Sequence, residues 1–159
     1  MRLRHGVLFL ATLFSSLNLL AQAKPDFSGD YVLNKAKCQF QVQQAADLES
    51  GTVSIVQKGD SFKFSRVFTV KGKDDPLSYQ LTIGDKEVAA ERDGMKEFSR
   101  IYWENNALLY EVRMLAPQGE ATNVVRYTLE EGGRVLRADE TFHGPRLSYK
   151  NVWVFERKR

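Results

Sequence analysis

Reactive side chains are scarce in this sequence, and their types suit no common catalytic or metal site. It contains one cysteine and two histidines, and His5 falls in an amino-terminal segment with the character of an export signal. Cys38 and His143 remain, but Cys38 precedes the second predicted strand and His143 lies at a predicted hairpin turn. A Cys–His nucleophile needs both groups within hydrogen-bond reach, and a protein-only zinc site needs more ligands. With no phosphate-binding glycine loop either, we expect no enzyme, metal or cofactor.

A second set of polar side chains suits ligand binding. Arg66 lies in the run 62–68, on the same alternating face as three phenylalanines, where a charge is costly unless it is paired and hydrogen-bonded. Glu140, Asn123 and Asn151 fall on that face by the registers that the turns impose. Arg66 then either receives an anionic or hydrogen-bonding head group, or pairs internally with Glu140. A third alternative places these polar residues at a wet barrel rim.

The amino terminus has the three parts of a secretory signal peptide. Arg2, Arg4 and His5 are basic, residues 7–20 are mainly apolar, and Ala21-Gln22-Ala23 offers the small residues that a signal peptidase recognises. The apolar run is short for a membrane span, which needs about 20 residues. We therefore expect cleavage after Ala23, a secreted or periplasmic location, and one domain over residues 24–159 without an integral membrane segment.

The charge of residues 24–159 is nearly balanced, with 21 basic and 20 acidic side chains after Arg2 and Arg4 are removed. Basic and acidic residues alternate, which argues against a nucleic-acid partner. Cys38 has no partner for an intramolecular disulfide. Stability must therefore come from one hydrophobic core, for which a chain of this length suffices. The sequence sets no oligomeric state and no role for Cys38.

Ten short β-prone runs follow one another, separated by turn signals at the spacing typical of a β-sandwich or barrel. The predicted strands are 27–33, 52–57, 62–70, 77–83, 87–92, 97–103, 108–115, 122–129, 134–142 and 147–156. The longer connections are 71–76, which includes Asp74-Asp75 as a solvated pair, and 34–50. Phe40, Gln44 and Leu48 recur at helical spacing in the latter, which predicts either a short helix ended by Gly51 or a loop that plugs the barrel.

The turns also predict which residues face one another, because side chains alternate along a strand and a tight turn fixes the register. The expected pairs are Val53 with Arg66, Ile55 with Phe64, Trp103 with Leu108, Arg100 with Glu111, Tyr110 with Val125, Tyr127 with Ala138, Phe142 with Leu147 and Leu136 with Trp153. Arg126, Asp139 and Lys150 are expected side by side on the outer face. All turns agree on one apolar face, and a nearest-neighbour meander of this kind favours closure into a barrel.

Both ends of this domain resemble the calycin superfamily of lipocalins and fatty-acid-binding proteins. The segment Asp26-Phe27-Ser28-Gly29-Asp30-Tyr31 resembles the first strand, with Tyr31 where the family usually has Trp. Residues 151–157 resemble the closing strand of the fatty-acid-binding branch. A nearer likeness is to secreted bacterial lipocalin-like proteins that begin Phe-Ser-Gly-Thr-Trp. Trp153 and Phe155 stand where the family carries an Arg and a Tyr for a carboxylate, so the resemblance implies the barrel but not that carboxylate site.

We therefore expect an all-β fold, an antiparallel up-and-down meander of about ten strands closed into a barrel, with one short helix or lid between the first two strands. The expected function is an exported protein that binds a small apolar or amphiphilic molecule, which needs an interior volume of roughly 300 Å³ or more. The alternative is a ligand-free structural or protein-interaction module with a filled core. The predicted ligand-binding residues are Phe64, Arg66, Tyr79, Trp103, Tyr110, Asn123, Tyr127, Glu140, Asn151 and Trp153.

Overall fold

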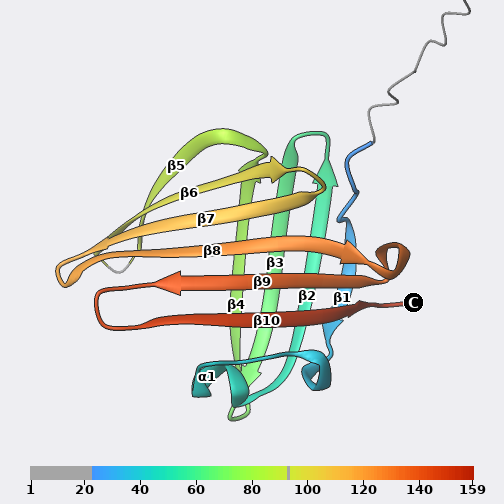
Figure 1. Ribbon diagram of the computed structural model, residues 1–159, viewed down its shortest axis with the longest axis horizontal. Coiled ribbons are helices and arrows are strands. Elements are labelled where there is room, and N and C mark those ends of the chain that lie inside the picture. Colours follow the sequence, from blue (N-terminus) through green and yellow to red (C-terminus); the bar gives the residue numbers. More distant parts are fainter. Residues whose placement is uncertain (1–22, 93) are drawn as a thin grey trace, which may run out of the picture.

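The computed structural model describes residues 23–92 and 94–159, so the predicted signal peptide lies outside the described residues apart from Ala23. One ten-stranded antiparallel sheet, in the order β4-β3-β2-β1-β10-β9-β8-β7-β6-β5, curves into a nearly closed barrel (Figure 1). The strands are β1 (Gly29–Leu33), β2 (Leu48–Lys58), β3 (Ser61–Val70), β4 (Lys73–Thr82), β5 (Gly84–Arg92), β6 (Met95–Glu104), β7 (Ala107–Ala116), β8 (Gly119–Glu130), β9 (Val135–His143) and β10 (Ser148–Arg157). The predicted all-β meander with a short helix after the first strand is confirmed.

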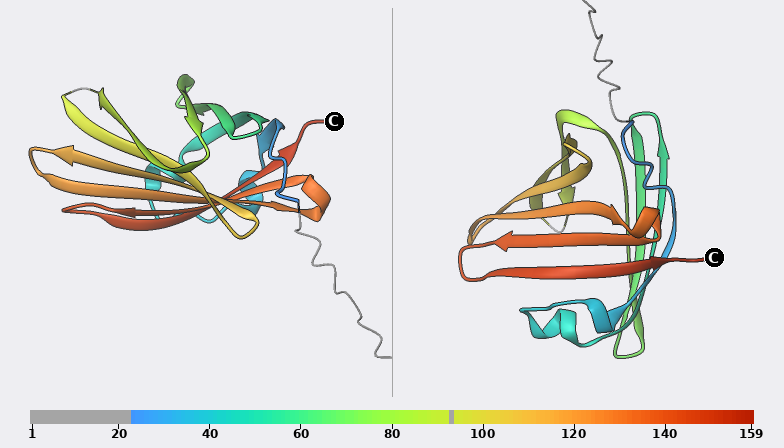
Figure 2. Two further views of the ribbon diagram at one scale, coloured as in Figure 1. Left: turned by 90° about the horizontal axis from the view of Figure 1, so that it is seen from above. Right: turned by 45° about the vertical axis from the view of Figure 1, so that its right-hand side comes forward.

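The two end strands of the sheet, β4 and β5, are consecutive in the chain but do not form a ladder with each other. Ring stacking and one isolated backbone bridge connect β4 and its end to β7 and β6 instead. The rings of Tyr79 in β4 and Tyr110 in β7 stack with centroids 4.4 Å apart, and Ile83 forms an isolated bridge with Ile101 in β6. Figure 2 shows β5 curving away from β4 in both views. Aromatic packing thus continues the barrel wall where the backbone ladder stops.

Most predicted registers are confirmed. Val53 pairs with Arg66, Trp103 with Leu108, and Tyr127 with Ala138. These agreements follow from the tight turns, which return the chain with the same face inward.

The predicted register of the strand pair that follows the Gly144-Pro145 turn was wrong by two residues. The connection has four residues, closed by a hydrogen bond from the Gly144 amide to the Leu147 carbonyl (2.8 Å), so Phe142 pairs with Tyr149. Leu147 leaves the inner face and is 51% exposed. A slip of two residues keeps every later side chain on its predicted face, because the alternation has a period of two.

The expected outer row of Arg126, Asp139 and Lys150 is correspondingly wrong in part. Arg126 and Asp139 do pair across β8 and β9, but Lys150 lies opposite Thr141. Asp139 accepts hydrogen bonds from Arg137 (2.7 Å from Nη2 to Oδ1). Arg126 forms its ion pair with Glu104.

The connection between β1 and β2 forms one 3₁₀ turn, η1 (Lys35–Lys37), and one turn of helix, α1 (Gln43–Ala46). The predicted helix end at Gly51 was wrong, because β2 already begins at Leu48. Between the two turns the chain lies along β10, where Gln39 pairs with Val152, and the Phe40 ring packs edge-on against Trp153 at 4.7 Å. The segment is therefore both a short helix and a cover packed against the barrel.

One end of the barrel is closed by a tightly packed core. Its fully buried side chains include Phe27, Tyr31, Phe62, Ile101 and Leu108. Arg157 covers this core: its guanidinium lies over the Tyr31 ring at 4.9 Å. It donates hydrogen bonds to the Ser28 carbonyl (2.6 Å), the Gly133 carbonyl (2.8 Å) and the Tyr31 hydroxyl (2.8 Å). Arg157 thus holds Tyr31 in the packed end of the barrel.

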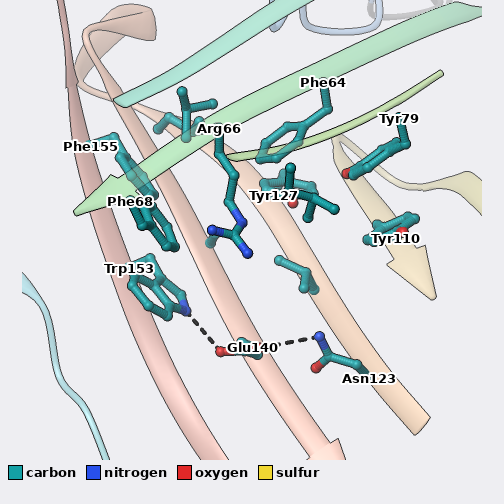
Figure 3. A pocket seen from close by; sticks show the side chains of 15 residues that line it. Phe64, Arg66, Phe68, Tyr79, Tyr110, Asn123, Tyr127, Glu140, Trp153 and Phe155 are labelled. Atoms are coloured by element: carbon teal, nitrogen blue, oxygen red, sulfur yellow. Dashed lines mark hydrogen bonds between the residues drawn. The ribbon is translucent and has the colours of Figure 1, made fainter. Parts of the chain in front are cut away.

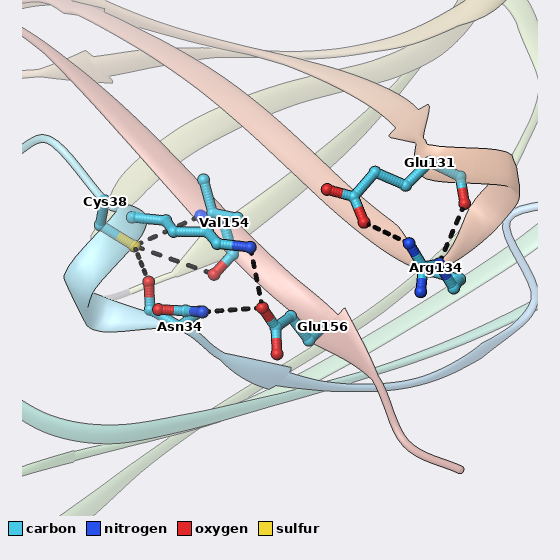
Figure 4. Close-up of polar contacts among 7 residues, drawn as sticks. Asn34, Cys38, Glu131, Arg134, Val154 and Glu156 are labelled. Atoms are coloured by element: carbon cyan, nitrogen blue, oxygen red, sulfur yellow. Dashed lines mark hydrogen bonds and ion pairs between the residues drawn. The ribbon is translucent and has the colours of Figure 1, made fainter.

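The Cys38 thiol packs against the backbone of β10 (Figure 4). It lies 3.3 Å from the Asn34 carbonyl oxygen, and it accepts a hydrogen bond from the Val154 amide at 3.3 Å. Burial raises the pKa of the Cys38 thiol, which keeps it in the less reactive protonated form. His143 contacts Ser148 at the β9–β10 turn.

Leu136 and Asp139 offer a direct test of the inner and outer faces. Leu136 has no exposed surface, so Leu136→Ala should lower the free energy of unfolding by about 2–5 kcal/mol. The side chain of Asp139 is 37% exposed, and an exposed ion pair is worth about 0–1 kcal/mol. Denaturant melts of both variants measure the difference, and a larger loss for Asp139→Ala would show that the faces are assigned backwards.

Candidate functional site

A cavity of about 200 Å³ lies inside the barrel, beyond the closed core. On β3, Phe62 belongs to the fully buried core, whereas Phe64, Arg66 and Phe68 further along the same face line the cavity. Its complete lining is Val53, Phe64, Arg66, Phe68, Leu77, Tyr79, Tyr110, Asn123, Val125, Tyr127, Leu136, Ala138, Glu140, Trp153 and Phe155. The barrel is therefore packed at one end and hollow towards the other.

The cavity walls are formed largely by stacked aromatic rings (Figure 3). On one side, Phe64 stacks on Tyr79 at 5.0 Å, and Tyr79 stacks on Tyr110. On the other, Phe68 stacks on Trp153 at 5.1 Å. Ring pairs of this kind are held by dispersion and quadrupole interactions beyond simple area burial, so these parts of the wall are apolar and closely packed.

Arg66 is anchored to the cavity wall and to its rim. The guanidinium lies 4.3 Å above the centre of the Phe68 ring, and Nη1 forms an ion pair with Asp75 Oδ2 at 3.1 Å. The side chain of Arg66 is 21% exposed and that of Asp75 67% exposed, so the cavity reaches solvent on this side. The alternative of an internal Arg66–Glu140 pair was wrong, because Asp75 is the carboxylate that Arg66 binds.

Glu140 is held instead by neutral donors from the two neighbouring strands. Its Oε2 accepts hydrogen bonds from Asn151 Nδ2 and Trp153 Nε1, both at 2.9 Å. Its Oε1 accepts one from Asn123 Nδ2 at 3.2 Å. None of the ion pairs found in residues 23–92 and 94–159 involves Glu140. Hydrogen bonds fix this carboxylate in orientation without neutralising its charge.

Two further polar atoms in the cavity wall are buried and lack a hydrogen bond of ordinary geometry within the described part of the chain: Asn123 Oδ1 and the Tyr79 hydroxyl. The orientation of the Asn123 amide follows from Glu140, because a carboxylate accepts from Nδ2 and would repel Oδ1. Burial also raises the pKa of Tyr79 and of Tyr127. Both phenols thus stay neutral well above the pH at which tyrosine ordinarily ionises.

Eight of the ten predicted ligand-binding residues line the cavity: Phe64, Arg66, Tyr79, Tyr110, Asn123, Tyr127, Glu140 and Trp153. Trp103 does not, because it packs against Phe27 at the closed end. Asn151 lies behind Glu140, where its Oδ1 accepts a hydrogen bond from the Gln41 amide (3.0 Å). It therefore links the β1–β2 connection to the cavity wall.

Asp75 was missed because residues 71–76 were assigned to a connection. β4 begins at Lys73, so the alternation that places Leu77 and Tyr79 inward also brings Asp75 to the inner side of the rim. Extending the alternation two residues towards the amino terminus would have found it. The prediction that Asp74-Asp75 lies in a turn was wrong for this reason, whereas both residues are exposed as predicted.

Neither metal ligation nor a helical membrane span is found in the described residues. No three His, Cys, Asp or Glu side chains within residues 23–92 and 94–159 are grouped so that they could hold a metal ion. In the same part of the chain, no helix has the length and apolar character needed to cross a bilayer.

The fold has close counterparts among solved structures. Schistosoma mansoni fatty acid binding protein in complex with arachidonic acid is 16% identical over 84% of this chain and 96% of that chain, with a TM-score of 0.58. Zebrafish ileal bile acid-binding protein complexed with cholic acid is 15% identical over 83% and 98% (TM-score 0.57). Secretory abundant heat soluble protein 4 from Ramazzottius varieornatus is 12% identical over 87% and 100% (TM-score 0.60).

These matches show the antiparallel β-barrel fold that the sequence predicted. At such low identity they establish the fold alone. No family model matches the sequence. No curated protein matches it either.

The buried phenols predict how stability depends on alkaline pH. Because the folded state raises the pKa of Tyr79 and Tyr127, their contribution is full below the unfolded pKa of about 10 and is lost as pH rises above it. A Tyr79→Phe/Tyr127→Phe double variant should therefore lose less stability than the wild type between about pH 9 and 11. Denaturant melts across this range provide the measurement. Parallel pH profiles for the two proteins would contradict the assignment.

Proposed function

We propose that this chain is an exported protein that binds a small apolar or amphiphilic molecule in the cavity between Arg66 and Glu140. The observation that carries the proposal is a hollow with aromatic walls and a few fixed polar groups, inside a barrel that is otherwise closely packed. Ligand sites commonly combine such walls and such groups. The export part of the proposal rests on the signal-like pattern of residues 1–23.

The size of the cavity bears on the kind of ligand. A dry cavity of about 150 Å³ is enough to bind benzene, whereas sites for drug-sized molecules start at about 300 Å³. The 200 Å³ found here suits a compact ligand, or the head of a longer one whose tail leaves past the Arg66–Asp75 rim. The bound molecules named for the structural neighbours, arachidonic acid and cholic acid, support ligand binding as the general function. They also support binding rather than catalysis.

The tightly packed end of the barrel favours the second candidate, a ligand-free structural or interaction module. Among the described residues, six large side chains that do not line the cavity have less than 2% of their surface exposed, and the cavity is below the usual range for drug-sized ligands. The unpaired buried acceptor on Asn123 argues the other way, since buried polar atoms in a finished core normally have partners. We therefore prefer the binding function.

The two tryptophans allow the binding proposal to be tested. Trp153 lines the cavity and donates to Glu140, whereas Trp103 packs at the closed end. In a Trp103→Phe variant, titration with short alkyl amphiphiles should change the emission of Trp153 in a saturable way. The matched Trp153→Phe variant, which keeps Trp103, should not respond. A Trp103→Phe variant that stays unresponsive to all amphiphiles would leave the filled module as the better account.

A further inference from the structure

We propose that the site selects a head group carrying a protonated amine, bound by Glu140 Oε1 and Asn123 Oδ1. This inference rests on the proposed binding function and adds the chemical class of the ligand. It runs against the expectation from the sequence that Arg66 would receive an anion.

The first step is the charge balance of the cavity. Arg66 is already in an ion pair with Asp75, so the formal charges of these two residues cancel before any ligand enters. Glu140 has three neutral donors and no ion pair among the described residues. Arg66, Asp75 and Glu140 together carry a net formal charge of −1, and Glu140 is the one of the three without an ion pair in the described part of the chain, so a cation is favoured over a carboxylate beside it.

The second step is the distribution of hydrogen bonds on Glu140. Oε2 receives two donors, Asn151 and Trp153, which matches the capacity of a carboxylate oxygen. Oε1 receives one, from Asn123. The same Asn123 amide carries the buried Oδ1 that has no hydrogen-bond partner in the described chain. Two acceptors on adjoining groups thus call for a donor with at least two N–H bonds, which an ammonium group supplies.

The third step is the surroundings of these acceptors. In Figure 3, Asn123 lies on the side of Glu140 away from Trp153. The cavity walls include Tyr110, Tyr127 and Trp153, and aromatic faces attract a cation through their quadrupoles. A carboxylate beside aromatic walls is chemically matched to an alkylammonium ion, with its chain lying against the rings.

Three probes of equal chain length separate the possible outcomes: hexylamine, hexanol and hexanoate at neutral pH, titrated into the wild-type protein by calorimetry. Hexylamine should bind at least about tenfold more tightly than hexanoate, a difference expected when only one charge sign is matched. Hexanol should lie between them. Hexanol or hexanoate binding as tightly as hexylamine would overturn the amine assignment while leaving the binding function standing. Failure of all three probes to bind would overturn both.

A substitution at Glu140 assigns the selectivity to that residue. Glu140→Gln keeps the side-chain size and removes the charge, so the preference for hexylamine over hexanol should disappear while hexanol still binds. Glu120→Gln is the matched control, because it removes one negative charge from an exposed position on β8. If Glu140→Gln is folded by circular dichroism and keeps the amine preference, the assignment to Glu140 is wrong.

Discussion

The constraint on which this structure depends is the alternation of side chains along the strands, which the tight turns preserve from one strand to the next. Each tight turn returns the chain with the same face inward, so neighbouring strands of the meander share one inner surface. The four-residue connection after Gly144 shows how robust this is. It moves the β9–β10 register by two residues and still leaves Trp153 and Phe155 inside.

On that single inner surface, apolar and polar residues are separated along the barrel. Phe27, Tyr31 and their neighbours fill one end, and Arg157 closes it with hydrogen bonds to two carbonyls and a phenol. Towards the other end, a carboxylate and a guanidinium face the interior and apolar side chains no longer meet in the middle. A buried charge must keep its hydrogen bonds, and Glu140 does so by using donors from both neighbouring strands. The hollow and the polar network thus have the same origin, which is the presence of polar side chains on the inner face at this end of the barrel.

The sequence predicted the fold well because the signals for it are local. Turn dipeptides such as Asn105-Asn106 set the register, and the period of two then placed eight of the ten predicted site residues around one cavity. The sequence could not predict the position of a side chain along the barrel axis or the ion-pair partner of a charged residue. Trp103 faces inward as expected, but alternation does not tell at which end of the barrel a side chain lies. The partner of Arg66 was misassigned because the start of β4 carries three acidic or basic residues and a proline, which do not resemble a strand.

The central claim is that the barrel is hollow at one end and closed at the other, and methyl-resolved nuclear magnetic resonance tests it most directly. In a titration with a small amphiphile, the methyl signals of Leu77 and Val125, which line the cavity, should shift together and saturate. The methyl signals of Ile55, Ile101 and Leu108 in the closed core should stay where they are. Shifts centred on Ile101 and Leu108, or no saturable shift at Leu77 and Val125, would contradict the account.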